Sequence, residues 1–498
     1  METEYSEGKS LIIASNRLPI TIKRNENGDK QIEPGSGGLV TAMAPVLRNR
    51  GGTWIGWTGD VDTDSFEINH LLQSQSRELG YLLKAVHLSS EERDGYYRGF
   101  ANEVLWPLFH DFVSTCIFDP DYWEHYDSVN EKFAKVIAAN ARGDSFIWIH
   151  DYHLMRVATK LRELGVRNKI GYFLHIPFPP PDIFVRLPWR FQIINSLLDY
   201  DLLGFQTNRD KRNFIRCVRT YVKNIRIRGR RQIAEGQIGD HKLRIGAFPI
   251  SIDYNEFARM AASEEVSRKA WYIHEDYPEK QIILGVDRLD YTKGIPERLQ
   301  AFRNALIRYP ELRGKITLMQ IVVPSRKQIP SYSDLKTEIE VLVSNINGEF
   351  TDSGWIPIVY IYQSFPRDEL TAYYRTSEIA LITPLKDGMN LVAKEYCACN
   401  IERTGALILS EFTGASAQLY KGAIMVNPHD VVGIADAIHQ VFHMNKEERM
   451  SRMKVLRRSV RTYDIFRWVD SFMEAVIAKK LDNFPVIEDF NPVDNVTT

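Results

Sequence analysis

The sequence has few cysteines, no long apolar run and almost no net charge. Only four of its 498 residues are cysteine, too few to make a disulfide framework for a chain of this length. No apolar run approaches the roughly 20 residues that a membrane span needs. A formal net charge of −1 at pH 7 gives no general argument for nucleic acid or an anionic membrane as a partner. Residues 1–7 lack the basic and apolar regions of a signal peptide, so we expect a cytoplasmic protein.

What the sequence does contain is a repeated alternation of short apolar runs with helical stretches. The chain is too long for one core, and such alternation predicts an α/β fold with doubly wound parallel sheets. We place one domain at residues 1–250, a second at 251–463 and a loose tail at 489–498. Residues 247–253 are expected to hold the last strand of the first half and the crossing to the second. Two helices, about 431–442 and 464–479, are expected to close the chain. The other apolar runs that predict buried strands are 11–15, 54–57, 146–149, 169–174, 202–207, 281–286, 316–323, 358–362, 379–384, 406–410 and 423–428.

Residues 387–395 combine a strand end, a glycine turn and the start of a helix. A helix that begins near Met389 would point backbone N–H groups and the positive end of its dipole at one spot, which suits a phosphate. Glu395 would then lie about 9 Å further along the axis, about the distance from a diphosphate to the ribose of the same nucleotide. Asp387, on the strand side of the turn, would face the group attached to the far side of the diphosphate. An ordinary glycine turn with two solvated carboxylates explains the stretch equally well.

Cationic residues follow two of the predicted strands. Arg288 and Lys293 come after the run at 281–286, and two cations at that edge would neutralise a diphosphate leaving group. Surface ion pairs are the alternative interpretation. Arg17 follows the first strand, where open α/β sheets place their ligands. The glycine-rich residues 35–39 indicate either a second anion-binding loop or a flexible turn.

Aromatic and histidine residues suggest a polar ligand for the first half. Tyr97 and Trp106 can stack on a sugar and donate hydrogen bonds, although packing is the simpler explanation. The segment from His150 to His153 permits a metal interpretation, which we disfavour because no second cluster completes a coordination shell. Hydrogen bonding from Asp151 to substrate hydroxyls is the better hypothesis. His175 precedes a proline-rich loop that should hold it in place.

Two further segments have competing interpretations. Residues 225–233 alternate apolar and basic side chains around a glycine, which indicates a nucleic-acid stripe or, more simply, a β-hairpin with a solvated face. Residues 60–62 match the Asp-x-Asp pattern of metal-dependent transferases, but their acidic surroundings favour a solvated turn.

Taken together, six motifs resemble the trehalose-6-phosphate synthase family, in its fungal type. The resemblance implies a GT-B fold, in which two Rossmann-like domains face each other across a cleft and a last helix, 464–488, crosses back to the first. It also implies transfer of glucose, with retention, from UDP-glucose to glucose 6-phosphate, giving α,α-trehalose 6-phosphate and UDP for trehalose biosynthesis in stress responses. The motifs are residues 36–39, Tyr97 with Trp106, 150–154, 175–179, 287–294 and 387–395.

The resemblance also assigns roles to individual residues. The acceptor and its phosphate would be bound by Arg17, Tyr97, Trp106, Asp151 and Arg326. The catalytic set would be Asp151, His175, Arg288, Lys293 and Asp387. UDP-glucose would be bound by Gly37, Gly38, His175, Arg288, Lys293, Asp387, Gly388, Met389, Asn390, Leu391, Val392 and Glu395.

No covalent nucleophile or cofactor is expected from these residues. We expect a front-face transfer that needs no metal, because two cations and a helix N-terminus can neutralise the leaving group. The expected partners are the two small substrates, a second copy of the chain in a homo-oligomer, and a trehalose synthase–phosphatase complex. Two alternatives to this function remain. One is a catalytically silent regulatory subunit, and the other is a different retaining GT-B transferase that makes sucrose phosphate or a glucan.

Overall fold

The computed structural model separates the chain into two compact units. Unit 1 comprises residues 1–249 and 468–487, and unit 2 comprises residues 250–467 and 488–498. None of the helices in the part of the chain that the structure describes is both long enough and apolar enough to cross a membrane. The structure describes residues 11–24, 30–35, 38–61, 65–229, 232–325, 330–478, 481, 484 and 489–492.

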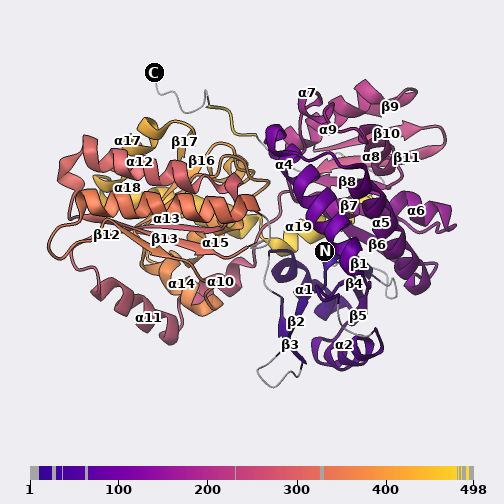
Figure 1. The fold of residues 1–498 in the computed structure, drawn as a ribbon, viewed down its shortest axis with the longest axis horizontal. Coiled ribbons are helices and arrows are strands. Elements are labelled where there is room, and N and C mark those ends of the chain that lie inside the picture. Colours follow the sequence, from indigo (N-terminus) through magenta and orange to yellow (C-terminus); the bar gives the residue numbers. More distant parts are fainter. Residues whose placement is uncertain are drawn as a thin grey trace. The chain divides into compact units, whose positions relative to one another are not determined.

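Unit 1 is built on a nine-stranded sheet (Figure 1). Its first six strands are parallel and run in the order β5-β4-β1-β6-β7-β8. The chain therefore starts in the middle, extends the sheet to one edge and then returns to extend it the other way from β1. This is the doubly wound order, in which ligands bind where the direction of winding reverses, here between β1 and β6. The strands are β1 (Leu11–Arg17), β4 (Thr53–Trp57), β5 (Leu82–Ala85), β6 (Phe146–His150), β7 (Ile170–Phe173) and β8 (Leu202–Phe205).

The remaining three strands of this nine-stranded sheet confirm the hairpin prediction for residues 225–233. β9 (Ile225–Arg228) pairs antiparallel with β10 (Ile233–Ile238), which pairs antiparallel with β11 (His241–Ala247). Along β9 the side chains alternate between half-buried isoleucines and exposed arginines, as a strand with one solvated face requires. β11 ends at Ala247, so the strand predicted to run on from residue 247 is wrong, although the predicted crossing to the second half does lie in this segment. Residues 248–253 form the connection to unit 2.

Helix α19 (Ile465–Ile477) contributes its aromatic face to unit 1. Phe472 stacks on Trp148 with the ring centroids 4.3 Å apart, and Trp468 donates its indole N–H to the carbonyl of Phe248 at 3.1 Å. A Cβ on Gly171 would come within 2.9 Å of the Phe472 ring, so that strand position must be a glycine for the helix to pack this closely. The helices of unit 1 are α1 (Gly38–Arg50), α2 (Ser65–Leu79), α5 (Pro120–Asn140), α6 (Val157–Glu163), α8 (Arg190–Leu197) and α9 (Asn208–Tyr221), with short helices α3 (Ser90–Glu92), α4 (Trp106–Phe109) and α7 (Pro181–Phe184).

Unit 2 holds a six-stranded, wholly parallel sheet in the order β14-β13-β12-β15-β16-β17 (Figure 1). This order is doubly wound as well, and its winding reverses between β12 and β15. The doubly wound α/β class predicted from the sequence is therefore confirmed in both units. The strands are β12 (Gln281–Arg288), β13 (Ile316–Val323), β14 (Ile358–Ile361), β15 (Ile379–Ile382), β16 (Ala406–Ser410) and β17 (Ile424–Val426).

The helices of unit 2 include one that the sequence analysis missed. α18 (Lys446–Thr462) lies between the two predicted closing helices, and its sequence is mostly charged, with Arg449, Met453, Leu456 and Val460 as its buried residues. A helix with so narrow an apolar stripe gives a weak periodic signal. The others are α10 (Tyr254–Ala261), α11 (Glu264–Glu275), α12 (Ile295–Arg308), α13 (Pro330–Phe350), α14 (Arg367–Thr376), α15 (Leu391–Cys399), the short α16 (Ser416–Leu419) and α17 (Val431–Phe442).

Candidate active site

An ion pair marks the point in unit 2 where the winding of the sheet reverses. Lys293 Nζ lies 2.6 Å from Asp387 Oδ2, and the two side chains are only 10% and 15% exposed. Lys293 ends the turn after β12, and Asp387 follows β15, so the pair joins the carboxyl ends of neighbouring parallel strands. The alternative interpretation for Lys293 was a surface ion pair. Lys293 does form an ion pair, but the pair is largely buried and not on the surface. Arg288 is the exposed last residue of β12, at the same edge.

The turn after Asp387 is made by Asn390 and not by Gly388. Asn390 adopts a left-handed conformation with φ of 74°, and its Oδ1 accepts a hydrogen bond from the N–H of Ala393. Asn390 is therefore the N-cap, and α15 begins at Leu391. The prediction of a helix start near Met389 is wrong by two residues, which puts Glu395 about 6 Å and not 9 Å along the axis from the first helical residue.

The helix N-terminus itself is present as predicted. The first N–H groups of a helix have no partner within it, and the described residues supply no acceptor for those of Leu391 and Val392. Asn390 Nδ2 donates to Asp387 Oδ2 at 3.2 Å, so the capping residue also orients the carboxylate. The turn can therefore bind an anion through backbone N–H groups beside the Lys293 ammonium.

Two glycines allow other loops to support this turn. The carbonyl oxygen of Gly388 would lie 1.9 Å from a Cβ on Gly414, so only glycine fits at that position. The N–H of Ala415 donates to the carbonyl of Met389 at 2.8 Å. Gly294 has φ of 61° and lies against the carbonyl of Thr383. The sequence analysis did not identify Gly414, although a glycine four residues after the end of β16 was the available signal.

Glu395 lies one helical turn into α15 and is held by a tyrosine. Tyr374 OH donates to Glu395 Oε2 at 2.9 Å, and the surrounding protein raises the pKa of the Glu395 carboxyl through desolvation. Beside it, Lys394 Nζ donates to the carbonyl of Ile250 and to Gln418 Oε1, both at 2.6 Å. Burial lowers the pKa of Lys394 to about 7. Lys394 thus anchors the helix, while Glu395 is the carboxylate available to a ligand.

In unit 1, Arg17 lies at the reversal point and stacks on aromatic rings. Its guanidinium carbon is 4.1 Å from the centroid of Trp57 and 5.6 Å from that of Tyr97. A Cβ on Gly59, where φ is 95°, would fall 1.4 Å from Arg17 Nη1. Gly59 therefore leaves the space that the guanidinium occupies. The sequence analysis identified Arg17 and Tyr97 but neither Trp57 nor Gly59 as members of this cluster.

A π-helix, η1 (Arg93–Leu105), carries Tyr97 to the site. Such helices are rare and occur most often at functional sites, and nothing in the sequence pattern predicted one here. The neighbouring Tyr96 is fully buried and donates to Asn16 Oδ1 at 2.9 Å, so it belongs to the core of unit 1. Tyr97 is half-buried and stacks on His153. Trp106, directly after η1, lies 5.8 Å from Tyr152 between ring centroids.

His150, Asp151 and His175 lie together at the carboxyl ends of β6 and β7. Asp151 is a non-glycine residue with φ of 75°, and its Oδ1 accepts a hydrogen bond from the His175 N–H at 3.3 Å. Such strained backbone clusters at active sites. His150 Nδ1 lies 3.1 Å from His175 Nε2. Burial lowers the pKa of His175 to about 3 and that of His150 well below its usual range, so both rings are neutral near pH 7.

The environment of His150 indicates which ring donates. His150 Nε2 is buried and has no partner among the described residues, and a buried N–H without a partner is costlier than a buried acceptor. We infer that His150 carries its proton on Nδ1 and donates to His175 Nε2. His175 then carries its proton on Nδ1, which makes that nitrogen a hydrogen-bond donor.

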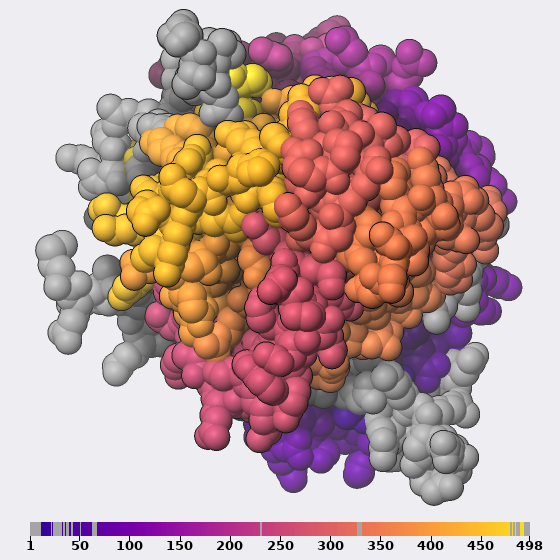
Figure 2. All heavy atoms as spheres, turned by 90° about the vertical axis from the view of Figure 1, so that its left-hand side faces the viewer, coloured from indigo at the N-terminus to yellow at the C-terminus, as the bar shows by residue number. Residues whose placement is uncertain are grey.

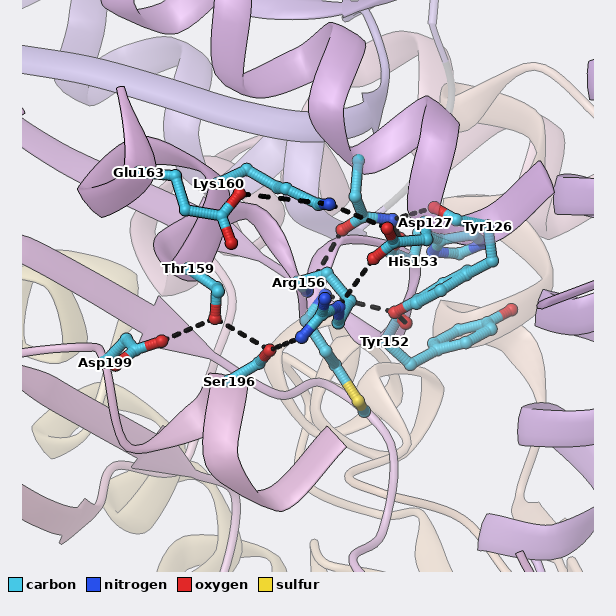
Figure 3. A network of polar contacts seen from close by, with 12 residues as sticks. Tyr126, Asp127, Tyr152, His153, Arg156, Thr159, Lys160, Glu163, Ser196 and Asp199 are labelled. Atoms are coloured by element: carbon cyan, nitrogen blue, oxygen red, sulfur yellow. Dashed lines mark hydrogen bonds and ion pairs between the residues drawn. The ribbon is translucent and has the colours of Figure 1, made fainter. Parts of the chain in front are cut away.

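The segment that follows Asp151 is anchored by a polar network (Figure 3). Tyr126 OH donates to the carbonyl of Tyr152 at 2.8 Å. Arg156 donates to Asp127 Oδ1 at 2.7 Å and to Ser196 Oγ at 2.6 Å, and Figure 3 shows it at the centre of the group. These contacts tie the segment to α5 and α8, so Asp151 and His153 are presented from a rigid support.

Some of the predicted residues cannot be placed in this way. Gly37, Arg326 and Asp62 lie outside the described residues. Gly38 is the first residue of α1, so a glycine-rich stretch does precede a helix. The remaining predicted residues form two groups, one in each unit. The unit 1 cluster contains Arg17, Tyr97, Trp106, Asp151 and His175, and the unit 2 cluster contains Arg288, Lys293, Asp387, Gly388, Met389, Asn390, Leu391, Val392 and Glu395.

Comparison with known proteins agrees with the fold and with the motifs. The profile of glycosyltransferase family 20 matches residues 9–478. Trehalose-6-phosphate synthase of Mycobacterium bovis is 40% identical over 480 residues, which cover 95% of this chain and 96% of that protein.

Solved structures give the same result. An α,α-trehalose-phosphate synthase (UDP-forming) from Burkholderia xenovorans, in complex with glucose-6-phosphate, superposes with a TM-score of 0.84 at 33% identity, covering 94% of this chain and 100% of that one. A structure described as trehalose-6-phosphate from E. coli bound with UDP-2-fluoro glucose has a TM-score of 0.83 at 35% identity, with 94% and 99% covered. The predicted GT-B class is thereby confirmed, and the chain belongs to glycosyltransferase family 20.

Proposed function

We propose that this glycosyltransferase moves glucose from UDP-glucose to glucose 6-phosphate with retention, giving α,α-trehalose 6-phosphate and UDP. The observation that supports this most directly is that each sheet carries polar and charged residues at its own reversal point. Open α/β sheets bind their ligands at that point. The similar proteins described above include one in complex with glucose-6-phosphate and one bound with UDP-2-fluoro glucose.

The unit 2 cluster is the proposed donor site. Arg288, Lys293 and the first N–H groups of α15 would neutralise the charge that develops on the departing diphosphate. Glu395 would accept hydrogen bonds from the ribose, while Asp387 would face the glucose. Because Lys293 pairs with Asp387, the ammonium is already oriented before a diphosphate arrives.

The unit 1 cluster is the proposed acceptor site. Arg17, whose guanidinium lies over the Trp57 ring, would bind the acceptor phosphate together with Tyr97, Trp106 and Arg326. Asp151 would accept a hydrogen bond from an acceptor hydroxyl, and His175 would donate to the donor sugar.

The proposed chemistry uses no covalent intermediate and no metal. The leaving phosphate oxygen would take the proton of the attacking hydroxyl on the same face of the sugar, which retains the anomeric configuration. The protein would position both substrates and neutralise charge. Trapping a glycosyl adduct on any side chain by mass spectrometry would contradict this mechanism.

We further propose a cytoplasmic homo-oligomer that works beside a trehalose-phosphate phosphatase, a partnership that co-purification would test.

One experiment tests the activity directly. The protein is incubated with UDP-glucose and glucose 6-phosphate, and NMR identifies the product and its anomeric configuration. We expect UDP release only when both substrates are present, with α,α-trehalose 6-phosphate as product. No such release would favour the alternative of a catalytically silent regulatory subunit, and formation of sucrose phosphate or a glucan would favour another retaining transferase.

A further inference from the structure

The C-terminal end of α17 carries two histidines that face a carboxylate from another element. His439 lies in α17 and His443 directly follows it, so their spacing of four residues places both on one face of the helix. Glu311 lies in η5 (Pro310–Leu312), the turn after α12. The possible ligand atoms of these three residues all lie within 4.8 Å of one another, and no other group of this kind occurs among the described residues.

The three side chains are already close and remain accessible. His439 Nε2 lies 2.9 Å from Glu311 Oε1, and the His439 and His443 ring centroids are 4.6 Å apart. The side chains of His439 and Glu311 are 30% and 45% exposed. A small ion from solvent can therefore reach them. A simple ion pair would explain His439 and Glu311, but it gives no role to the third donor, His443.

Neighbouring residues hold the His439 ring in place. Tyr309 stacks on it with the centroids 3.8 Å apart and the planes at 11°. Tyr309 OH in turn donates to Asp436 Oδ1 at 2.7 Å, and Arg308 Nη2 lies 3.2 Å from the same carboxylate oxygen. The stacking limits the orientations that the His439 ring can adopt, and the contacts to Asp436 keep Tyr309 in position. Figure 2 looks onto unit 2, where the chain near residue 310 borders the later helices.

We propose that Glu311, His439 and His443 form a binding site for a divalent ion of the zinc class. Two imidazoles and one carboxylate are a common protein ligand set for Zn²⁺ and leave a fourth position for water. Histidine nitrogen also selects Zn²⁺, Cu²⁺ and Ni²⁺ over Mg²⁺ and Ca²⁺. The ion would fasten the end of α17 to the turn after α12, which stabilises unit 2.

This site is distinct from the proposed catalytic cluster. α12 begins directly after the turn that holds Lys293 and has 14 residues. At 1.5 Å per residue the helix is roughly 20 Å long, and Glu311 lies in the turn beyond its far end. The proposed ion has a structural role. It takes no part in the proposed transfer reaction.

Metal titration of the full chain tests the proposal. The protein is treated with EDTA, dialysed, and titrated with Zn²⁺ by calorimetry and with Co²⁺ by visible absorption. We expect one ion per chain, the d–d bands of low-coordinate Co²⁺ and a higher Tm with Zn²⁺. His443→Gln and Glu311→Gln should each weaken binding about tenfold or more. His70→Gln, which changes an exposed histidine of α2 in unit 1, is the matched control and should bind as the unmodified chain does.

Equal Zn²⁺ affinity for the unmodified chain and His443→Gln overturns the proposal, as does the lack of any saturable binding. Loss of glucosyl transfer in these samples would bear on the proposed function alone.

Discussion

Lys293 Nζ and Asp387 Oδ2 lie 2.6 Å apart although 94 residues separate them in the chain. The pair connects the ends of the two strands between which the sheet of unit 2 reverses its winding. A cation there can bind a diphosphate, and a carboxylate there can bind a sugar hydroxyl. Because each residue is the partner of the other, substitution of one changes the state of both.

Replacement of Asp387 should separate chemistry from nucleotide binding. In Asp387→Ala the Lys293 ammonium loses its carboxylate but remains available to the diphosphate, so we expect kcat to fall about 100-fold or more while the Kd of UDP changes little. Calorimetry with UDP and steady-state kinetics measure the two effects. Asp387→Asn is the control, since it keeps the shape and can still accept from Lys293. A larger loss of UDP affinity than of kcat would reverse the assignment.

Replacement of Glu395 should have the opposite effect. Glu395→Ala removes the proposed ribose acceptor, and a hydrogen bond to a charged group contributes about 1.5–3 kcal/mol, so UDP should bind roughly 10- to 150-fold more weakly. Tyr374→Phe removes the donor that orients this carboxylate and should give a smaller loss in the same direction. Calorimetric titration with UDP measures both. Unchanged UDP affinity in Glu395→Ala would remove Glu395 from the donor site.

Gly59→Ala should impair the acceptor site from outside it. The new Cβ would displace the Arg17 guanidinium from Trp57. We expect the KM for glucose 6-phosphate to rise about 10- to 100-fold, the range for a misplaced binding group, with the KM for UDP-glucose unchanged. Gly143→Ala is the matched control, because nothing lies within 4 Å of a Cβ at that position. Equal effects on both substrates would indicate a general folding defect.

The buried histidine pair should make stability depend on pH. In the folded chain the pKa of His175 is about 3 and that of His150 is also lowered, whereas the unfolded histidines titrate near 6.5. Between these values the unfolded state binds more protons, so stability is complete above about pH 6.5 and decreases as the pH falls, by up to about 1.4 kcal/mol per pH unit for each histidine. His150→Gln should have a shallower decrease of Tm between pH 7 and pH 5. A parallel pH profile would contradict this account.

A strong chelator should leave glucosyl transfer intact. Arg288, Lys293 and the N-terminus of α15 provide the positive charge that a metal would otherwise supply. We expect UDP release at an unchanged rate in EDTA, even where EDTA lowers Tm by removing an ion from the site at Glu311. Recovery of a lost rate by added Mg²⁺ or Mn²⁺ would show that the transfer needs a metal.

The sequence alone determined the fold class and the location of the proposed site. Apolar runs of strand length that alternate with helices specify doubly wound sheets, and the carboxyl ends of parallel strands meet at one edge. Arg17, Asp151, His175, Arg288 and Asp387 could therefore be assigned to sheet edges from their positions after such runs. These features depend on local periodicity, which the sequence shows directly.

The tertiary structure alone decided which of these residues contact one another. The pairing of Lys293 with Asp387, the stacking of Arg17 on Trp57, the bond between His150 and His175 and the cluster of Glu311 with His439 each join segments distant in sequence. The π-helix that presents Tyr97 and the cap formed by Asn390 were also not predicted. These contacts depend on the strand order, on how the helices pack and on how closely each glycine lets its neighbours approach. A local sequence pattern predicts none of these three properties.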